Sequence, residues 1–303
     1  MLGVHSHPYN QQMYKKALLF LLATSVTAVA SVGKSVAVAA TSEATPPELV
    51  NAINNLDSAA SKKDINAVMQ FYTPNFTHSD GLTKQKLRDS LEGLWKRYNN
   101  IKYSTEVTKW DRKGNTYTVE TVTRIQGAKP GNDGEYKLDA QLVSAQVYQA
   151  NGDNLQMSRQ DILAEKSSIT SGEKPPKVEL RLPDKIGVGR QYALDAVIPE
   201  PLGTNLLLGS IIEEEVSPAN YLKDTTIELE PLRAGGVFKI GQAPYTVGDR
   251  WVSVVLVQET GITISSQRMR VSKNTVGNQY KSSPESATTP SRVRPDPNSS
   301  QTL

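Results

Sequence analysis

The chain has 303 residues, no cysteine and three histidines. The absence of cysteine excludes a disulfide framework, a cysteine nucleophile and zinc sites built from cysteine and histidine. The length predicts two domains of ordinary size, each long enough to bury its own hydrophobic core.

Residues 1–40 have the composition of a secretory signal peptide. They contain no acid, Lys15 and Lys16 precede an uncharged apolar run, and small residues lead up to Ala40. A basic start, an apolar stretch and a small-residue exit are the parts of such a signal. The alternative is a membrane anchor, but the run over 17–33 is shorter than the roughly 20 residues that a bilayer requires.

The signal predicts a mature protein outside the cytoplasm. We expect cleavage after Ala40 or after Ala30, and translation starts at Met1 or at Met13, which directly precedes the lysine pair. The location is the periplasm, the thylakoid lumen if the cell is a cyanobacterium, or the medium. No later segment is long and apolar enough to span a membrane.

Cleavage changes the charge of the protein. Three lysines in residues 1–40 account for the net charge of +3, so the mature chain is neutral. A neutral chain without a basic stripe does not favour nucleic acid as a partner. His78 is the one histidine left after position 40, which excludes a two-histidine metal site, and we expect no metal and no cofactor.

Composition divides the mature chain into two domains. A polar stretch with one glycine and two prolines over 166–176 predicts a linker, and the polar segment 274–303 predicts a disordered tail. These boundaries leave domains at 46–165 and 177–273.

The first domain is predicted to open with three helices. Thr45-Pro46-Pro47-Glu48 has the form of a capping box, and apolar residues then recur at helical spacing to Ala59. Asp64 is predicted to cap a second helix that stops before Pro74, and Thr83 to cap a third.

After residue 100 the apolar period changes to two, which predicts about four antiparallel strands up to Leu163. The alternation slips at Leu142-Val143, which predicts a bulge. Helices followed by strands predict an α+β fold. In the second domain, short apolar runs separated by turn signals predict about seven strands in a β-sandwich, with Trp251 in its core.

Residues 64–80 carry a family resemblance. An acid caps the second helix, an apolar run ends in Phe71-Tyr72, and a short strand leads to Asp80. This pattern resembles the nuclear-transport-factor-two-like (SnoaL-like) superfamily over 46–165, which implies three helices on a curved antiparallel sheet that forms a cone-shaped roll. The second domain resembles immunoglobulin-like modules in layout only.

The superfamily includes ketosteroid isomerase, scytalone dehydratase and polyketide cyclases, as well as members without known catalysis. Counted from Tyr72, the resemblance places Asp80 at the general-base carboxylate of the isomerase family, and Leu56 at its tyrosine donor. Leucine donates no hydrogen bond, so a developing oxyanion lacks its main stabilisation. Asp80 is also followed by Gly81, and this pair is typical of a turn. Both interpretations stay open.

Other polar residues offer weaker candidates. His78 lies two residues before Asp80, so on a strand their side chains share a face and can form an acid/base pair, although a partly exposed histidine is the simpler interpretation. Glu213-Glu214-Glu215 alternate faces on a strand, which favours a solvated edge over a cation site. Aromatic residues of the first domain line a pocket or fill its core: Tyr72, Trp95, Tyr103, Tyr117, Tyr136 and Tyr148.

The leading hypothesis is an exported, non-catalytic binding or scaffold protein of the bacterial cell envelope. Its partner is a small apolar ligand in the cone-shaped pocket or an envelope protein on the sheet face. The alternative is a small-molecule isomerase, dehydratase or cyclase with Asp80 as base. The sheet face with Thr118, Glu120, Val122 and Arg124 is mixed in polarity, which predicts a monomer or weak homodimer.

Overall fold

The computed structural model describes residues 44–273, except 132–133, 153, 200–205, 224 and 233–234. The predicted signal peptide and the predicted disordered tail lie outside the described residues. Among the described helices, none has the length and apolar content needed to cross a membrane.

Three helices form at the predicted positions: α1 (Pro47–Ser61), α2 (Ile65–Gln70) and α3 (Lys84–Arg97). The Asp64 carboxylate accepts a hydrogen bond from the Ala67 amide at the start of α2, as predicted. The Thr83 hydroxyl likewise caps α3 by accepting from the Lys86 amide. These caps fix where both helices begin, because they satisfy amides that lack a partner within the helix.

The predicted capping box at Thr45 is wrong. Pro46 occupies the cap position of α1 and no side chain bonds to the first amides, whereas Pro47 begins the helix. Proline suits this position because its missing N–H would have no partner in the first turn.

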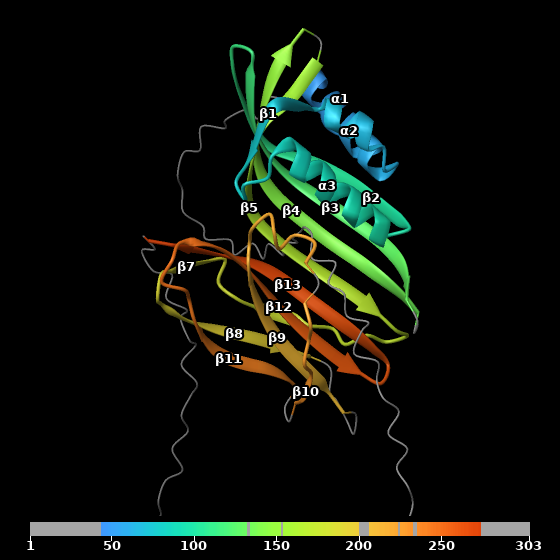
Figure 1. Ribbon diagram of the computed structural model, residues 1–303, viewed down its shortest axis with the longest axis vertical. Coiled ribbons are helices and arrows are strands. Elements are labelled where there is room, and N and C mark those ends of the chain that lie inside the picture. Colours follow the sequence, from blue (N-terminus) through green and yellow to red (C-terminus); the bar gives the residue numbers. More distant parts are fainter. Residues whose placement is uncertain are drawn as a thin grey trace, which may run out of the picture.

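The helices lie against one face of a curved sheet (Figure 1). This part of the sheet consists of β1 (Tyr72–His78), β2 (Asn100–Lys113), β3 (Thr116–Gly131), β4 (Gly134–Asn151) and β5 (Asn154–Ser171). Strands β2 to β5 pair in sequence and antiparallel, and β1 pairs parallel with β5. The register of β4 against β5 shifts between Val143 and Ser144, next to the predicted bulge.

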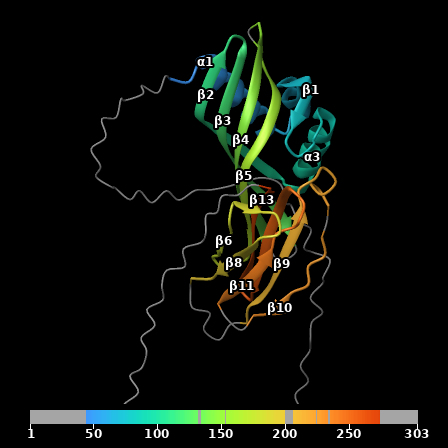
Figure 2. The ribbon, with the colours of Figure 1, turned by 90° about the vertical axis from the view of Figure 1, so that its left-hand side faces the viewer.

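The elements of the described chain after β5 are all strands (Figure 2). They are β6 (Glu179–Arg181), β7 (Lys185–Gly187), β8 (Gln191–Val197), β9 (Leu208–Glu215), β10 (Glu230–Pro231), β11 (Gly236–Gln242), β12 (Gly248–Gln258) and β13 (Gly261–Ser272). Strands β11, β8 and β6 form a separate three-stranded sheet.

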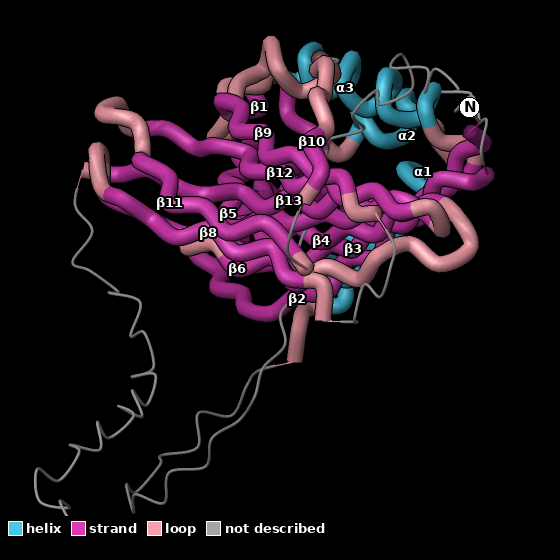
Figure 3. Tube along the Cα trace, turned by 90° about the horizontal axis from the view of Figure 1, so that it is seen from below, coloured by secondary structure: helices cyan, strands magenta, loops and turns pink. Residues whose placement is uncertain are grey.

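The predicted fold class, an α+β roll followed by an independent β-sandwich, is wrong. The structure is mostly β, and one ten-stranded sheet runs through both halves in the order β10-β9-β12-β13-β5-β4-β3-β2 with β1 and β7 attached. Figure 3 shows the helices gathered at one side of the strands. The two halves therefore share a backbone hydrogen-bond ladder.

Strand β5 makes this continuity possible. Residues 166–171, predicted as linker, extend β5 and pair with β4 on one side and β13 on the other. Their serines and threonine suggested a loop, but such residues are compatible with a strand when backbone partners lie on both sides.

Strand β12 lies between two hydrophobic cores. Trp251, Val255 and Val257 pack in the core that reaches the helices, and Val252, Val254 and Leu256 pack against the three-stranded sheet. The alternation follows from the two-residue period of a strand. Trp251 is 2% exposed, which confirms its predicted place in the core.

Candidate functional site

A cavity of about 90 Å³ lies between the helices and the facing sheet. Most of its lining is aliphatic or aromatic and comes from α1, α2, α3 and strands β1 to β5. The lining residues are Ile53, Leu56, Asp57, Ala60, Val68, Tyr72, Leu87, Leu91, Tyr103, Thr105, Thr123, Ile125, Leu142, Gln146, Tyr148, Met157 and Gln160. Its composition is that of a small-molecule site, apolar with a few placed polar groups.

Asp57 is the one acidic residue of this lining. It lies on α1, and its carboxylate accepts hydrogen bonds from the Thr105 amide at 2.6 Å and the Thr105 hydroxyl at 2.8 Å. Burial raises the pKa of Asp57, and the bonds from Thr105 oppose this shift. A carboxylate with a raised pKa in an apolar cavity is a typical functional group, because a ligand can stabilise its charge.

Three of the predicted pocket aromatics line this cavity: Tyr72, Tyr103 and Tyr148. Burial raises the pKa of each hydroxyl, and the negative charge of Asp57 raises it further. The Tyr103 hydroxyl accepts a hydrogen bond from Trp95 Nε1 at 3.0 Å, so Trp95 supports the lining without belonging to it.

The other two predicted aromatics lie elsewhere. The Tyr117 hydroxyl donates to Glu48 at 2.6 Å, and the ammonium of Lys129 lies 5.3 Å from the Tyr136 ring centre. Neither tyrosine lines the cavity.

Buried polar groups of β4 and β5 lie on the sheet side of the cavity. The Tyr148 hydroxyl donates to Gln146 Oε1 at 2.7 Å, and Gln146 Nε2 donates to the Ser144 hydroxyl at 3.0 Å. The amide of Gln160 reaches the same hydroxyl at 3.4 Å. Most of this polar wall is therefore satisfied within the protein and serves to fix the shape of the cavity.

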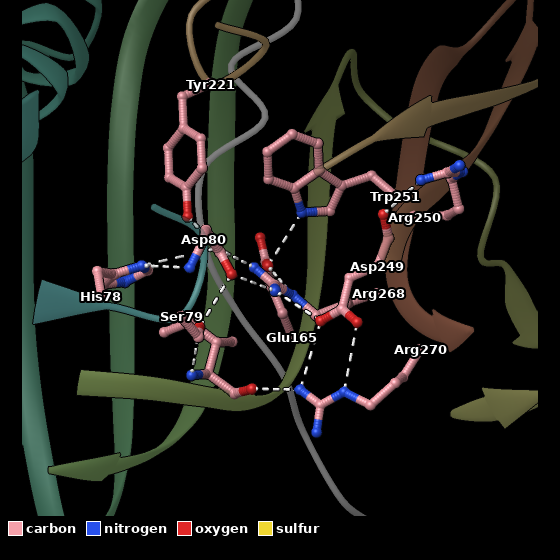
Figure 4. Close-up of polar contacts among 11 residues, drawn as sticks. His78, Ser79, Asp80, Glu165, Tyr221, Asp249, Arg250, Trp251, Arg268 and Arg270 are labelled. Carbon is pink, nitrogen blue, oxygen red and sulfur yellow. Dashed lines mark hydrogen bonds and ion pairs between the residues drawn. The ribbon is translucent and has the colours of Figure 1, made fainter. Parts of the chain in front are cut away.

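Asp80 does not line the cavity but lies at the junction of the two halves (Figure 4). It sits in a turn in which the Gly81 amide donates to the His78 carbonyl at 2.9 Å. Its carboxylate receives two hydrogen bonds from Arg268 of β13, at 2.9 and 2.6 Å, and a third from the Tyr221 hydroxyl. Asp80 therefore has two structural roles: it lies in a turn, and it forms an ion pair with Arg268.

The surroundings of Asp80 do not suit a general base. Burial alone would raise its pKa, but the hydrogen bonds and charge of Arg268 outweigh burial and lower the pKa to about 2. Such a carboxylate is a weak proton acceptor, because effective general bases have a pKa near the working pH. Its side chain is 4% exposed and both oxygens already have donors.

His78 is buried beside this turn. Its Nδ1 accepts a hydrogen bond from the Asp80 amide at 3.1 Å, so the neutral ring carries its proton on Nε2, which has no hydrogen-bond partner among the described residues. Burial lowers the pKa of His78 to about 4, with the charges of Asp80 and Arg268 acting in opposite directions. The predicted pairing of the two side chains exists at 3.9 Å, but with a neutral histidine.

Arg268 is the centre of the junction. Besides Asp80 it donates to Glu165 of β5 at 2.8 Å and to Asp249 of β12 at 2.9 Å. Trp251 Nε1 also donates to Glu165, at 3.0 Å, and Arg270 pairs with Asp249 at 3.3 Å. We call Asp80, Glu165, Tyr221, Asp249 and Arg268 the junction cluster.

The acidic run Glu213–Glu215 also has partners within the protein. Glu213 and Glu215 share a face with Arg250, at 3.7 and 3.9 Å, while Glu214 accepts from the Thr225 hydroxyl on the opposite face. The predicted alternation of faces is confirmed. Within the described residues, no group of three or more acidic or histidine side chains is arranged to hold a metal ion.

One family model matches part of the chain. Residues 173–272 match the model of a domain of unknown function (DUF8623). No curated protein matches the chain.

Several matched solved structures are nuclear-transport-factor-two-like proteins, and the matches cover 38% of this chain. A putative scytalone dehydratase from Novosphingobium aromaticivorans is 10% identical over 80% of its chain, with a TM-score of 0.33. An NTF-2-like protein of unknown function from Shewanella oneidensis is 13% identical over 95% of its chain, with a TM-score of 0.29. Bd1075 of Bdellovibrio bacteriovorus is 16% identical, with a TM-score of 0.31, and the match spans 38% of its length. At such identities and TM-scores, activity does not transfer from these proteins to this chain.

Proposed function

We propose that this chain is an exported, non-catalytic binding protein of the bacterial cell envelope that holds a small, mostly apolar molecule. The observation that carries the proposal is the cavity of about 90 Å³ with its apolar lining and single carboxylate. A largely pre-formed apolar cavity with few polar groups is the usual form of a small-molecule site.

The proposal of a binding role rests also on the state of Asp80. An isomerase, dehydratase or cyclase with Asp80 as base needs that carboxylate free and facing a substrate. The bidentate contact with Arg268 and the Tyr221 hydrogen bond occupy it, and it does not line the cavity. The junction cluster supports a different role, that of fixing the C-terminal half against the N-terminal half.

A cavity-filling variant tests the binding role. Ala60 lines the cavity and Ala59, its neighbour on α1, does not, although both are buried. Isobutanol, a neutral probe of five non-hydrogen atoms, should bind the wild-type protein with about millimolar affinity. We expect Ala60→Leu to lose this binding and Ala59→Leu to retain it, measured by ligand-observed NMR. Equal binding by both variants, or none by the wild type, contradicts the proposal.

The proposed export has its own test. Expression of the whole chain in a Gram-negative host should place a shortened protein in the periplasmic fraction, with Thr41 or Ser31 as its first residue by N-terminal sequencing. A protein that keeps residues 1–40 and stays with the membrane fraction would support the anchor instead.

A further inference from the structure

The lining of the cavity carries one negatively charged group and no positively charged one. It contains the carboxylate of Asp57 and no lysine, arginine or histidine. No described residue forms a salt bridge with Asp57, whose hydrogen-bond partners are the amide and hydroxyl of Thr105. A partly buried carboxylate without a cation is costly, and a positively charged ligand would offset that cost.

The geometry of Asp57 leaves room for such a ligand. Each carboxylate oxygen has two acceptor directions. One oxygen receives the Thr105 amide and the other the Thr105 hydroxyl, so each retains one direction. The Thr105 hydroxyl is itself 3.0 Å from the Thr123 hydroxyl, which holds this side of the carboxylate in place. The protein therefore fixes the orientation of the carboxylate and fills half of its hydrogen-bond acceptor directions.

Aromatic rings complete the preference for a cation. Tyr72, Tyr103 and Tyr148 line the same cavity as Asp57, and the face of a tyrosine ring attracts a positive charge. A carboxylate and three tyrosines without a competing cation form an environment suited to an ammonium group.

We propose that the ligand of this cavity is a small primary alkylammonium ion, with its ammonium group on Asp57 and its alkyl chain among the aliphatic lining residues. This inference rests on the proposed binding function and names the class of its ligand. An alkyl amine is protonated at neutral pH, as the lysine side chain is. The positive charge favours the ionised form of Asp57 and so opposes the rise in the pKa of Asp57 that burial causes.

The size of the cavity limits the alkyl chain. Its volume of about 90 Å³ is close to the share of three liquid waters at about 30 Å³ each, and is smaller than the roughly 150 Å³ of an apolar cavity that admits benzene. A branched chain of at most about four carbons fits this space only if part of the ligand extends toward the open side of the lining. Asp57, Leu56, Leu91 and Tyr103 are partly exposed, so this side of the lining reaches solvent.

Isobutylamine and isobutanol form a matched pair of probes, because they share a shape and differ in the charged group. Titration of the purified protein at pH 7.5, followed by protein NMR, should show isobutylamine binding at least tenfold more tightly than isobutanol. Asp57→Asn keeps the shape of the side chain and removes its charge, so it should weaken isobutylamine at least tenfold and leave isobutanol within twofold. Asp89→Asn, the same change at an exposed acid of α3 that does not line the cavity, is the matched control and should leave the affinity for both probes within twofold.

The outcomes separate this inference from the function on which it rests. If isobutanol binds as tightly as isobutylamine and Asp57→Asn changes neither, the cavity binds ligands but the ammonium assignment is wrong. If neither probe binds the wild type, the binding function itself fails. If Asp57→Asn does not fold, the pH dependence of binding to the wild type tests the inference. The affinity for isobutylamine must fall as acid protonates Asp57, while the affinity for isobutanol stays constant. The same pH dependence for both probes would overturn the inference.

Discussion

Asp80 and Arg268 stand 188 positions apart in the chain and form a bidentate ion pair, with Nη1 at 2.9 Å from Oδ1 and Nη2 at 2.6 Å from Oδ2. Both side chains are almost fully buried. The contact joins the turn after β1 to β13, and so links the helical end of the molecule to its C-terminal strands. Together with the β5–β13 ladder, it makes the two halves one structural unit.

Removal of Arg268 should destabilise the whole protein. Arg268→Ala leaves Asp80, Glu165 and Asp249 close together without their common cation, a loss of about 3–5 kcal/mol in the free energy of unfolding for a broken buried pair. Arg159→Ala, which breaks the exposed pair with Asp161, should cost about 0–1 kcal/mol. Urea unfolding of both variants measures the difference. Similar losses would show that the junction cluster contributes little.

His78 should make the protein less stable below pH 6.5. Its pKa is about 4 in the folded protein and near 6.5 when unfolded, so the unfolded chain binds the extra proton first. The contribution of neutral His78 to the free energy of unfolding is therefore present above pH 6.5. It is lost as the pH falls toward 4, by on the order of 1–3 kcal/mol. His78→Gln should flatten the dependence of the urea midpoint in this window. An unchanged slope in the variant would place the titration on another group.

Asp80 should contribute a second loss of stability at lower pH. Its folded pKa of about 2 lies below the ordinary value of 3.8, so its contribution is present above about pH 4 and disappears as the pH falls toward 2. Asp80→Asn should lack this acid transition. If Asp80→Asn and the wild type lose stability in parallel between pH 4 and 2, Arg268 does not hold the pKa down.

The junction and the cavity should respond independently to substitution. Asp80→Asn, compared with the wild type at a temperature where both are folded, should leave the affinity for isobutanol within twofold, because Asp80 does not line the cavity. Ala60→Leu should show the opposite pattern, lost binding with the junction intact. Coupled effects would mean that the cavity depends on how the two halves are joined.

Self-association should be weak. On the outer face of β3, Thr118 and Arg124 are exposed while Glu120 and Val122 are partly buried, so the face stays mixed in polarity. Stable homodimers bury a more apolar patch. Light scattering at micromolar concentration should give a monomer mass that rises only slightly with concentration. A dimer mass that persists on dilution contradicts this expectation.

Local signals in the sequence predicted the helices well. Asp64 and Thr83 cap their helices through their own side chains, and such caps depend on residues three positions apart. The continuous sheet was not predictable in the same way. Residues 166–171 are polar and became a strand because β4 and β13 supply partners from distant parts of the chain.

The candidate site also contains residues that local sequence patterns could predict and residues that they could not. Tyr103 and Tyr148 were candidates for a pocket or a core because they lie on strand-forming segments, and Tyr72 was a pocket candidate at the aromatic end of an apolar run. All three line the cavity. Asp57 was missed because a single acid on an amphipathic helix resembles any solvated residue. Arg268 was missed because its three carboxylate partners come from positions 80, 165 and 249, and no local spacing signals such a contact.

The most direct test of the binding role is a map of where a small molecule binds on the protein. Amide chemical shifts of the labelled protein, recorded during titration with isobutanol, report every residue at once. Saturating changes should gather at the cavity lining, at Asp57, Ala60, Tyr103 and Met157, and should leave Asp80 and Arg268 unchanged. Changes centred on the junction cluster, or no saturating change anywhere, would contradict the account.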